Sequence, residues 1–388
     1  MALNNHPEQK KVVLNHLRRL DEAAQVAVGT SLKVCEGERV LIITNPPIES
    51  YGIALALHNA VADAGGIPIF MIQPVKRQLD FADEAVIQAL ASQPEVCISI
   101  STQKIGKDRS AINKPYMFEG RRYDHIFTYL MASGKIRAFW SPSATQDMFI
   151  RTVPIDYGRL NREVQAVKMV LDRADEVRIK SPAGTDITIG LKNRKAFVDD
   201  GDLSRAGSGG NLPAGEAFIS PELGSSTGRI VFDGSIALAE GDRIVSEPVT
   251  VDVENGFVVR IDGGQDARLL EQSICFGEEK ARQFEQEGRF SPEKGAEYRQ
   301  NARNLGELGI GLNPAAVISG HMLEDEKAYR TCHLAIGSNY DEDAPALVHF
   351  DCLMRGPTIT AGIPGGDDEC ILRGGELNSD LLLNLPGT

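Results

Sequence analysis

The sequence predicts an α/β N-terminal domain with a largely parallel sheet, followed by a mixed α+β, β-rich C-terminal domain. The chain has 388 residues, which is two to three times a typical domain of about 150 residues. Its first half alternates short apolar runs with amphipathic stretches, the pattern of a parallel sheet covered by helices. After about residue 175, alternating β-branched runs joined by glycine turns predominate. We therefore expect one domain over residues 1–174 and a second over residues 175–388.

The N-terminal elements follow in order from this alternation. Residues 40–44 predict the first buried strand, which ends at Asn45-Pro46-Pro47 because proline cannot continue a strand ladder. Residues 51–64 have small and apolar side chains at helical spacing, and Gly65-Gly66 provides a C-cap. The remaining predictions are strands at 67–72, 96–101 and 125–131, and helices at 82–91 and 157–174.

The second half predicts antiparallel strands with few helices. Asn255-Gly256 divides the run 249–261 and favours a type I′ hairpin, in which both central residues have positive φ. Further strands are expected at 177–180, 186–191 and 229–233, and a helix at 267–286.

Composition limits the partners and the cellular location. The formal charge is −13, with 54 acidic against 41 basic residues, so neither nucleic acid nor an anionic membrane is an expected partner. The sequence has neither a secretory signal nor an apolar run near 18 residues. Its six cysteines form no Cys-x-x-Cys pair, and it contains no phosphate-binding loop motif. We expect a cytoplasmic protein with reduced thiols and no nucleotide site.

Histidines and carboxylates in the C-terminal half are the candidates for chemistry. His349 and Asp351 are two residues apart, so on a strand they point to the same face and can meet one metal ion. His333 lies in an apolar, strand-like run, where a hydrogen-bonded core histidine is the ordinary explanation. Glu216 follows a Pro-Ala-Gly turn, and Glu307 lies in a stretch so apolar that its charge must be exposed, paired or bound to a cation.

Four separated segments together resemble the thermophilic-type metallo-aminopeptidases, the aminopeptidase T and aminopeptidase S family. They are Asn211 to Glu216, Glu307 to Pro314, His333 to Gly337 with Tyr340 seven residues after His333, and His349 to Asp351. The resemblance implies the metal ligands Glu216, Glu307, His333, His349 and Asp351, with Tyr340 beside the metals. It also implies a homodimer that encloses the active-site cavity.

The activity implied by this resemblance is removal of N-terminal residues from small peptides. Five ligands with three carboxylates suit two divalent ions, which could be Zn, Co or Mn. Metal-bound water would then be the nucleophile. Tyr340 would hydrogen-bond the developing oxyanion, and a carboxylate such as Glu307 would carry the proton to the leaving amine.

Two alternatives remain open. Ring-cleaving dioxygenases that act on dihydroxypyridines are related to the same scaffold, and His333, His349 and Asp351 would supply their two-histidine, one-carboxylate site for a single Fe(II). A small aromatic heterocycle would then replace the peptide. The second alternative is a protein that keeps its metal ion but only binds a small ligand. The acidic run Asp341 to Asp343 follows Tyr340 in a connecting loop shorter than in the peptidases, and it is either solvated surface or a wall of the cavity.

Overall fold

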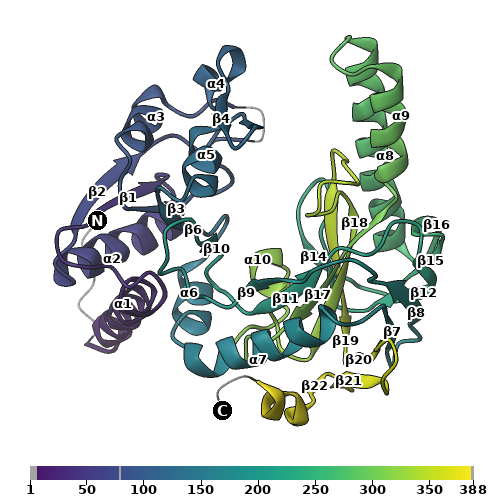
Figure 1. Ribbon diagram of the computed structural model, residues 1–388. Coiled ribbons are helices and arrows are strands. Elements are labelled where there is room, and N and C mark those ends of the chain that lie inside the picture. The colour runs from purple at the N-terminus through teal and green to yellow at the C-terminus, as the bar shows by residue number, and fades with distance from the viewer. Residues whose placement is uncertain (1–6, 78–79, 386–388) are drawn as a thin grey trace. The chain divides into compact units, whose positions relative to one another are not determined.

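The computed structural model describes residues 7–77 and 80–385 (Figure 1). The chain divides into two compact units. The first comprises Met1–Tyr157 and Gly201–Ala214, and the second comprises Gly158–Asp200 and Gly215–Thr388. The chain thus leaves the first unit, returns to it for 14 residues, and then completes the second unit.

The first unit contains a five-stranded sheet in the order β10-β6-β3-β1-β2, in which every neighbouring pair is parallel. Its central strand β3 is buried along its whole length, as expected for a sheet covered on both faces. The strands are β1 (Arg39–Thr44), β2 (Ile67–Ile72), β3 (Val96–Ile100), β6 (Arg137–Trp140) and β10 (Gly209–Gly210). A separate hairpin pairs β4 (Tyr116–Phe118) with β5 (Arg121–Tyr123).

Helices cover both faces of this sheet. Leu41 and Ile43 on β1 pack with side chains of α3 and α5, whereas α2 contacts β1, β2 and β3 on the opposite face, because successive strand residues point to opposite sides. The helices are α1 (Pro7–Val26), η1 (Ala27–Ser31), α2 (Ile48–Asp63), α3 (Glu84–Ala91), α4 (Arg109–Asn113), α5 (Ile126–Ala132) and α6 (Gln146–Thr152).

The strand predicted at 125–131 is wrong, because this segment forms helix α5. His125 lies at its N-cap and its ring nitrogen accepts a hydrogen bond from Phe127 N at 3.0 Å, which stabilises the first turn. Ile126 and Leu130, four residues apart, are its buried side chains. The spacing of four residues between these buried side chains is typical of a helix, and it outweighs the β-forming composition of the segment.

The second unit is built on two antiparallel sheets. The seven-stranded sheet has the order β14-β13-β19-β18-β17-β11-β9 and carries all the predicted ligands. Its strands are β9 (Phe197–Asp199), β11 (Glu216–Ile219), β13 (Ser235–Ile236), β14 (Arg243–Ile244), β17 (Leu305–Gly311), β18 (Thr331–Gly337) and β19 (His349–Arg355).

The eight-stranded sheet has the order β16-β15-β12-β8-β7-β20-β21-β22. Its hairpin at Asn255 and Gly256 is confirmed, since both residues have positive φ, 50° and 80°. The strands are β7 (Glu176–Lys180), β8 (Asp186–Gly190), β12 (Thr227–Phe232), β15 (Val249–Glu254), β16 (Phe257–Asp262), β20 (Thr358–Gly362), β21 (Glu369–Arg373) and β22 (Glu376–Leu377). The helices of the unit are α7 (Tyr157–Leu171), α8 (Gln265–Gln286), α9 (Pro292–Asn301), α10 (Met322–Asp325) and η2 (Ser379–Asn384).

The predicted fold class is confirmed: a parallel-sheet α/β region precedes a β-rich region of mixed α+β structure. Among the described residues, no helix combines the length and the apolar composition that a membrane span requires.

Candidate metal centre

Four neighbouring strands of the seven-stranded sheet, in the order β19-β18-β17-β11, bring the predicted ligands together. Glu307 on β17 lies opposite Ala335 on β18, and Ala335 lies opposite Asp351 on β19. Glu307 and Asp351 therefore flank the same position of the central strand. Glu216 begins the outer strand β11.

A bulge precedes the carboxylate on β17. The pairing between β17 and β18 shifts between Leu305 and Glu307, and bulges of this kind re-aim side chains near functional sites. Gly306 occupies the bulge, and a Cβ there would overlap the Ser338 carbonyl oxygen. All seven residues of β17 are buried, so the sequence places Glu307 in the core, where its charge requires partners.

Gly309 makes room for His333. The two residues are paired across β17 and β18, and a Cβ at position 309 would overlap the imidazole ring. Because Gly309 and Glu307 are two residues apart, they share a face of the strand. The ring lies over the glycine, with its Nε2 3.1 Å from Glu307 Oε1.

Gly309→Ala should therefore displace the His333 ring and weaken binding of a divalent ion at least about tenfold. This is the smallest loss of affinity expected when the groups that orient a metal ligand are disturbed. The measurement is a Mn²⁺ titration followed by electron paramagnetic resonance. Gly29→Ala is the matched control, because a Cβ at Gly29 meets nothing within 4 Å. Equal Mn²⁺ affinity in both variants would contradict this role of Gly309.

Glu307 is the centre of the cluster, because each of its oxygens lies against a histidine. Its Oε2 is 3.3 Å from His349 Nε2, and that nitrogen is 3.2 Å from Asp351 Oδ1. Potential ligand atoms form two trios, each within 4.8 Å: Glu216 with Glu307 and His333, and Glu307 with His349 and Asp351. All five predicted ligands thus converge, and Glu307 belongs to both trios.

The pKa values within the cluster are strongly shifted. Burial opposes protonation of His333, but its hydrogen bond with Glu307 and the surrounding carboxylates raise its pKa to about 9. Burial likewise opposes the charge of His349, yet Asp351 and Glu307 raise its pKa well above the usual value. Burial disfavours ionisation of Glu307, but the hydrogen bonds from both histidines lower its pKa. Without a metal ion, the cluster thus holds charged imidazolium and carboxylate groups.

The donor set fits a divalent ion. His349 Nδ1 lies 2.8 Å from the Ser338 carbonyl oxygen, so Nδ1 donates there and Nε2 is left to face the carboxylates, as in metal-binding histidines. Asp351 Oδ1 is buried and accepts no well-aligned hydrogen bond from the described residues, although His349 Nε2 lies 3.2 Å away. A buried carboxylate oxygen beside an oriented imidazole matches a site for a cation, which His333, His349, Asp351 and Glu307 could hold.

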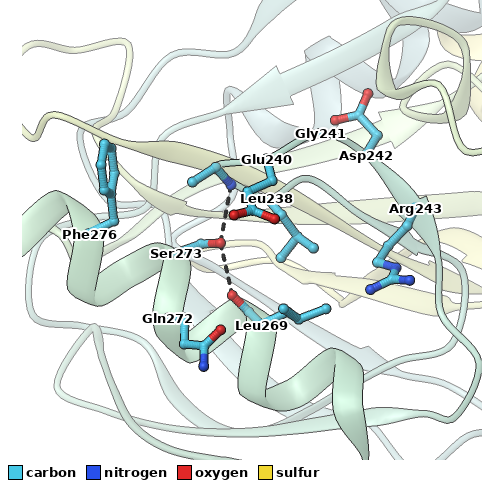
Figure 2. Close-up of a pocket in the computed structure, with 10 residues that line it drawn as sticks. Leu238, Glu240, Gly241, Asp242, Arg243, Leu269, Gln272, Ser273 and Phe276 are labelled. Carbon is cyan, nitrogen blue, oxygen red and sulfur yellow. Dashed lines mark hydrogen bonds between the residues drawn. The ribbon is translucent and has the colours of Figure 1, made fainter.

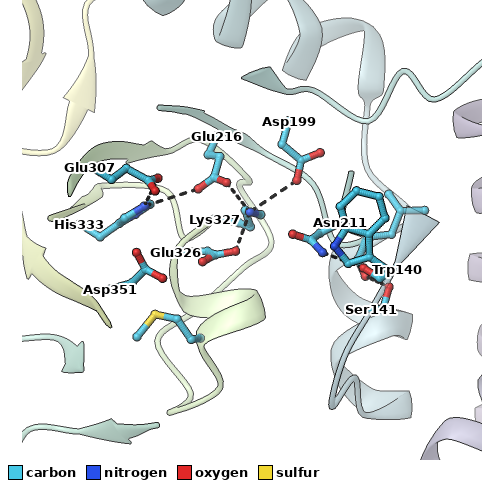
Figure 3. A network of polar contacts seen from close by, with 12 residues as sticks. Trp140, Ser141, Asp199, Asn211, Glu216, Glu307, Glu326, Lys327, His333 and Asp351 are labelled. Atoms are coloured by element: carbon cyan, nitrogen blue, oxygen red, sulfur yellow. Dashed lines mark hydrogen bonds and ion pairs between the residues drawn. The ribbon is translucent and has the colours of Figure 1, made fainter. Parts of the chain in front are cut away.

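A buried lysine, which no sequence pattern predicts, adjoins this cluster. Lys327 is 1% exposed, and its Nζ donates to Glu216 Oε1 at 2.5 Å and to Glu326 Oε1 at 2.7 Å. Asp199 Oδ2 lies 3.5 Å away, and Figure 3 shows the ammonium between these carboxylates. Burial raises the pKa of Asp199 to about 7 and that of Glu326 to about 8.

Aromatic side chains form a wall beside the centre. The rings of Phe197 and Phe218 are stacked at 5.4 Å, and Tyr340 lies 5.0 Å from Phe218 and 5.7 Å from His349. Phe197 and Tyr340 are 40% and 53% exposed, so the wall has a free surface. Burial of the hydroxyl and nearby carboxylates raise the pKa of Tyr340, so this hydroxyl keeps its proton and can donate a hydrogen bond.

The acidic run after Tyr340 is exposed and partly paired. Asp343 and Asp341 lie 2.9 and 3.7 Å from the Arg194 guanidinium, which is itself largely buried. Asn339 also donates to Asp343 at 2.6 Å. Two of the three acidic side chains thus hold the loop against Arg194.

A separate pocket of the second unit lies between residues 238–243 and one face of α8 (Figure 2). Ser273 joins its two sides, because its Oγ accepts from Ala239 N at 3.1 Å and donates to Leu269 O at 2.8 Å. The residues that line this pocket include none of the five predicted ligands.

Comparison with known proteins matches the sequence of the chain to one family. The family model described as 2,5-dihydroxypyridine 5,6-dioxygenase matches residues 143–377. A protein of that name from Pseudomonas putida KT2440 is 28% identical over 109 residues, which are 28% of this chain and 31% of that relative. The alignment thus spans about a third of the curated relative.

Two solved structures share the fold. The 2,5-dihydroxypyridine dioxygenase from Pseudomonas putida KT2440 superposes with a TM-score of 0.68 and 17% identity, over 94% of this chain and 98% of that one. Wild-type AmpT from Thermus thermophilus superposes with a TM-score of 0.64 and 17% identity, over 93% of this chain and 99% of that one. The fold is thus similar to both, while the sequence matches are to the dioxygenase.

Proposed function

Because the chain belongs to the 2,5-dihydroxypyridine 5,6-dioxygenase family, we propose that it is a mononuclear non-haem iron(II) dioxygenase. Its proposed substrate is a small dihydroxylated aromatic heterocycle, whose ring it opens with O₂. The observation that carries this proposal is the convergence of His333, His349 and Asp351 around Glu307. Two imidazoles with a carboxylate are the donor set typical of iron(II) oxygenases.

The aromatic wall supports a flat aromatic substrate. Phe218 and Tyr340 present ring faces and edges next to His349, and offset or edge-on contacts between rings favour binding of another ring. A peptide N-terminus would gain less from such a wall. Phe197 extends the surface outward.

The chain's own groups would orient the substrate and move its protons. Bound iron(II) would supply the redox chemistry with O₂ that these side chains lack. The protonated Tyr340 hydroxyl would donate a hydrogen bond to a substrate oxygen that carries negative charge. The Glu307 carboxylate, ionised and buried, would accept the proton of a substrate hydroxyl.

The aminopeptidase interpretation is the second candidate. It draws on the trio of Glu216, Glu307 and His333, which could hold a second divalent ion, and on the fold similarity to AmpT. At 17% identity that similarity concerns the fold alone, and the sequence matches favour the dioxygenase.

Substrate turnover distinguishes the two activities. Protein loaded with Fe(II) without oxygen and then mixed with 2,5-dihydroxypyridine in aerated buffer should consume one O₂ per ring, because a dioxygenase places both oxygen atoms in the product. An oxygen electrode and the loss of ring absorbance measure the two amounts. Oxygen-independent hydrolysis of leucine amide by Zn-, Co- or Mn-loaded protein, without O₂ uptake by the iron form, would instead favour the aminopeptidase.

We also propose a homodimer located in the cytoplasm. Light scattering tests the assembly, and a mass equal to one chain would contradict it. Fractionation of cells that express the protein tests the location, and recovery outside the cytoplasmic fraction would contradict that part.

A further inference from the structure

Lys327 is a cation held in the interior by carboxylates from separate parts of the chain. Asp199 comes from β9, Glu216 from β11, and Glu326 adjoins Lys327 itself. The backbone fixes its position, because Asn313 N donates to Lys327 O at 2.8 Å and Lys327 N donates to Glu324 O at 3.0 Å. A buried ammonium requires such compensation, and here the compensating group Glu216 is also a predicted metal ligand.

We propose that the Lys327 ammonium takes the place of a second divalent ion and thereby restricts the centre to one metal ion. This inference rests on the proposed function, because it requires a metal ion among Glu307, His333, His349 and Asp351. It assigns to Lys327 the role of setting how many metal ions the centre binds. This is a positioning role, because Lys327 does not contact the reacting atoms.

The geometry divides the cluster into two parts. In one part, Glu307 and Asp351 face the two histidines, and one divalent ion would balance their two negative charges. In the other, Asp199, Glu216 and Glu326 surround Nζ, so a cation is already present. Glu216 Oε1 is engaged by that ammonium at 2.5 Å, and an incoming ion would meet like charge at this carboxylate.

Removal of the ammonium should convert this second part into a metal site. Three carboxylates would then face a space without a cation, and oxygen donors of this kind suit Mn²⁺ or Mg²⁺. Glu216 Oε2 is buried, accepts no hydrogen bond from the described residues and lies 3.8 Å from His333 Nε2. It is therefore the atom through which a second ion would join the trio of Glu216, Glu307 and His333.

Metal content tests the inference directly. Wild type and Lys327→Met are equilibrated with Mn²⁺, desalted and analysed for manganese per chain by mass spectrometry, with electron paramagnetic resonance to detect coupling between two ions. We expect one ion in wild type and two coupled ions in Lys327→Met. Lys168→Met is the matched control, because Lys168 pairs with Asp172 at 2.9 Å away from the centre, and it should keep one ion.

Each outcome decides a separate point. One ion in both wild type and Lys327→Met would overturn the inference and leave the mononuclear function intact, whereas two ions in wild type would overturn the inference and favour the dinuclear aminopeptidase. No ion in wild type would overturn the proposed metal enzyme, and the inference with it. If neither Lys327→Met nor Lys327→Gln folds, Glu216→Gln decides: retention of one ion supports the inference, and loss of that ion overturns it.

Discussion

Replacing His349 with alanine should strip the protein of its divalent ion and reduce O₂ uptake with 2,5-dihydroxypyridine to background. His349 Nε2 faces both Glu307 and Asp351, and its Nδ1 contact with Ser338 O fixes the ring. Without this imidazole only His333 supplies nitrogen, so the two-histidine donor set is lost. We expect the affinity for the metal ion to fall by more than about 100-fold. This exceeds the loss expected when a residue that only hydrogen-bonds to a metal ligand is replaced.

His321→Ala is the matched control for this experiment. His321 lies in the same C-terminal half of the sequence as His333 and His349, is exposed, and precedes α10 without a side-chain capping bond. This variant should keep both its metal ion and its turnover. Metal retention and oxygen uptake in His349→Ala at the level of His321→Ala would remove His349 from the centre.

The strands that carry the site could be predicted because each has a local signal. The interval between His349 and Asp351 predicts one strand face, and the structure places both on β19. Glu307 in an apolar run predicts a buried, partnered charge, and the structure pairs it with two histidines. Only the family resemblance predicts that these strands bring their ligands together, because residue spacing within one strand carries no information on the neighbouring strands.

Lys327 illustrates what the sequence could not provide. It ends the run Glu324-Asp-Glu-Lys327, which reads as a solvated surface segment, yet it is nearly completely buried. Its burial depends on Asp199 and Glu216, more than 100 residues earlier in the chain, so no local pattern could reveal it. The aromatic wall could not be predicted for the same reason, because Phe197 on β9, Phe218 on β11 and Tyr340 in the loop after β18 meet only in the folded chain.

Metal affinity should rise steeply with pH between 6 and 8. In the metal-free protein the pKa of His333 is raised to about 9 and that of His349 lies well above 6.5, so both rings are protonated through this range. A metal ion binds only the neutral imidazole and must displace these protons. The affinity should therefore increase about tenfold per displaced proton for each pH unit, and up to about 10⁴-fold over the range if both rings bind the ion.

The pH at which the metal affinity levels off distinguishes this centre from one with histidines of ordinary pKa. Unperturbed imidazoles with pKa values near 6.5 would be neutral above pH 7, and the affinity would level off there. Mn²⁺ titrations at fixed ionic strength, with free Mn²⁺ measured by electron paramagnetic resonance, give the slope. Glu307→Gln should bring the plateau to lower pH, because it removes the carboxylate that contacts both rings. A wild-type affinity that levels off by about pH 7 would show that the carboxylates do not hold these imidazoles in the charged form, and the electrostatic account of the centre would fail with it.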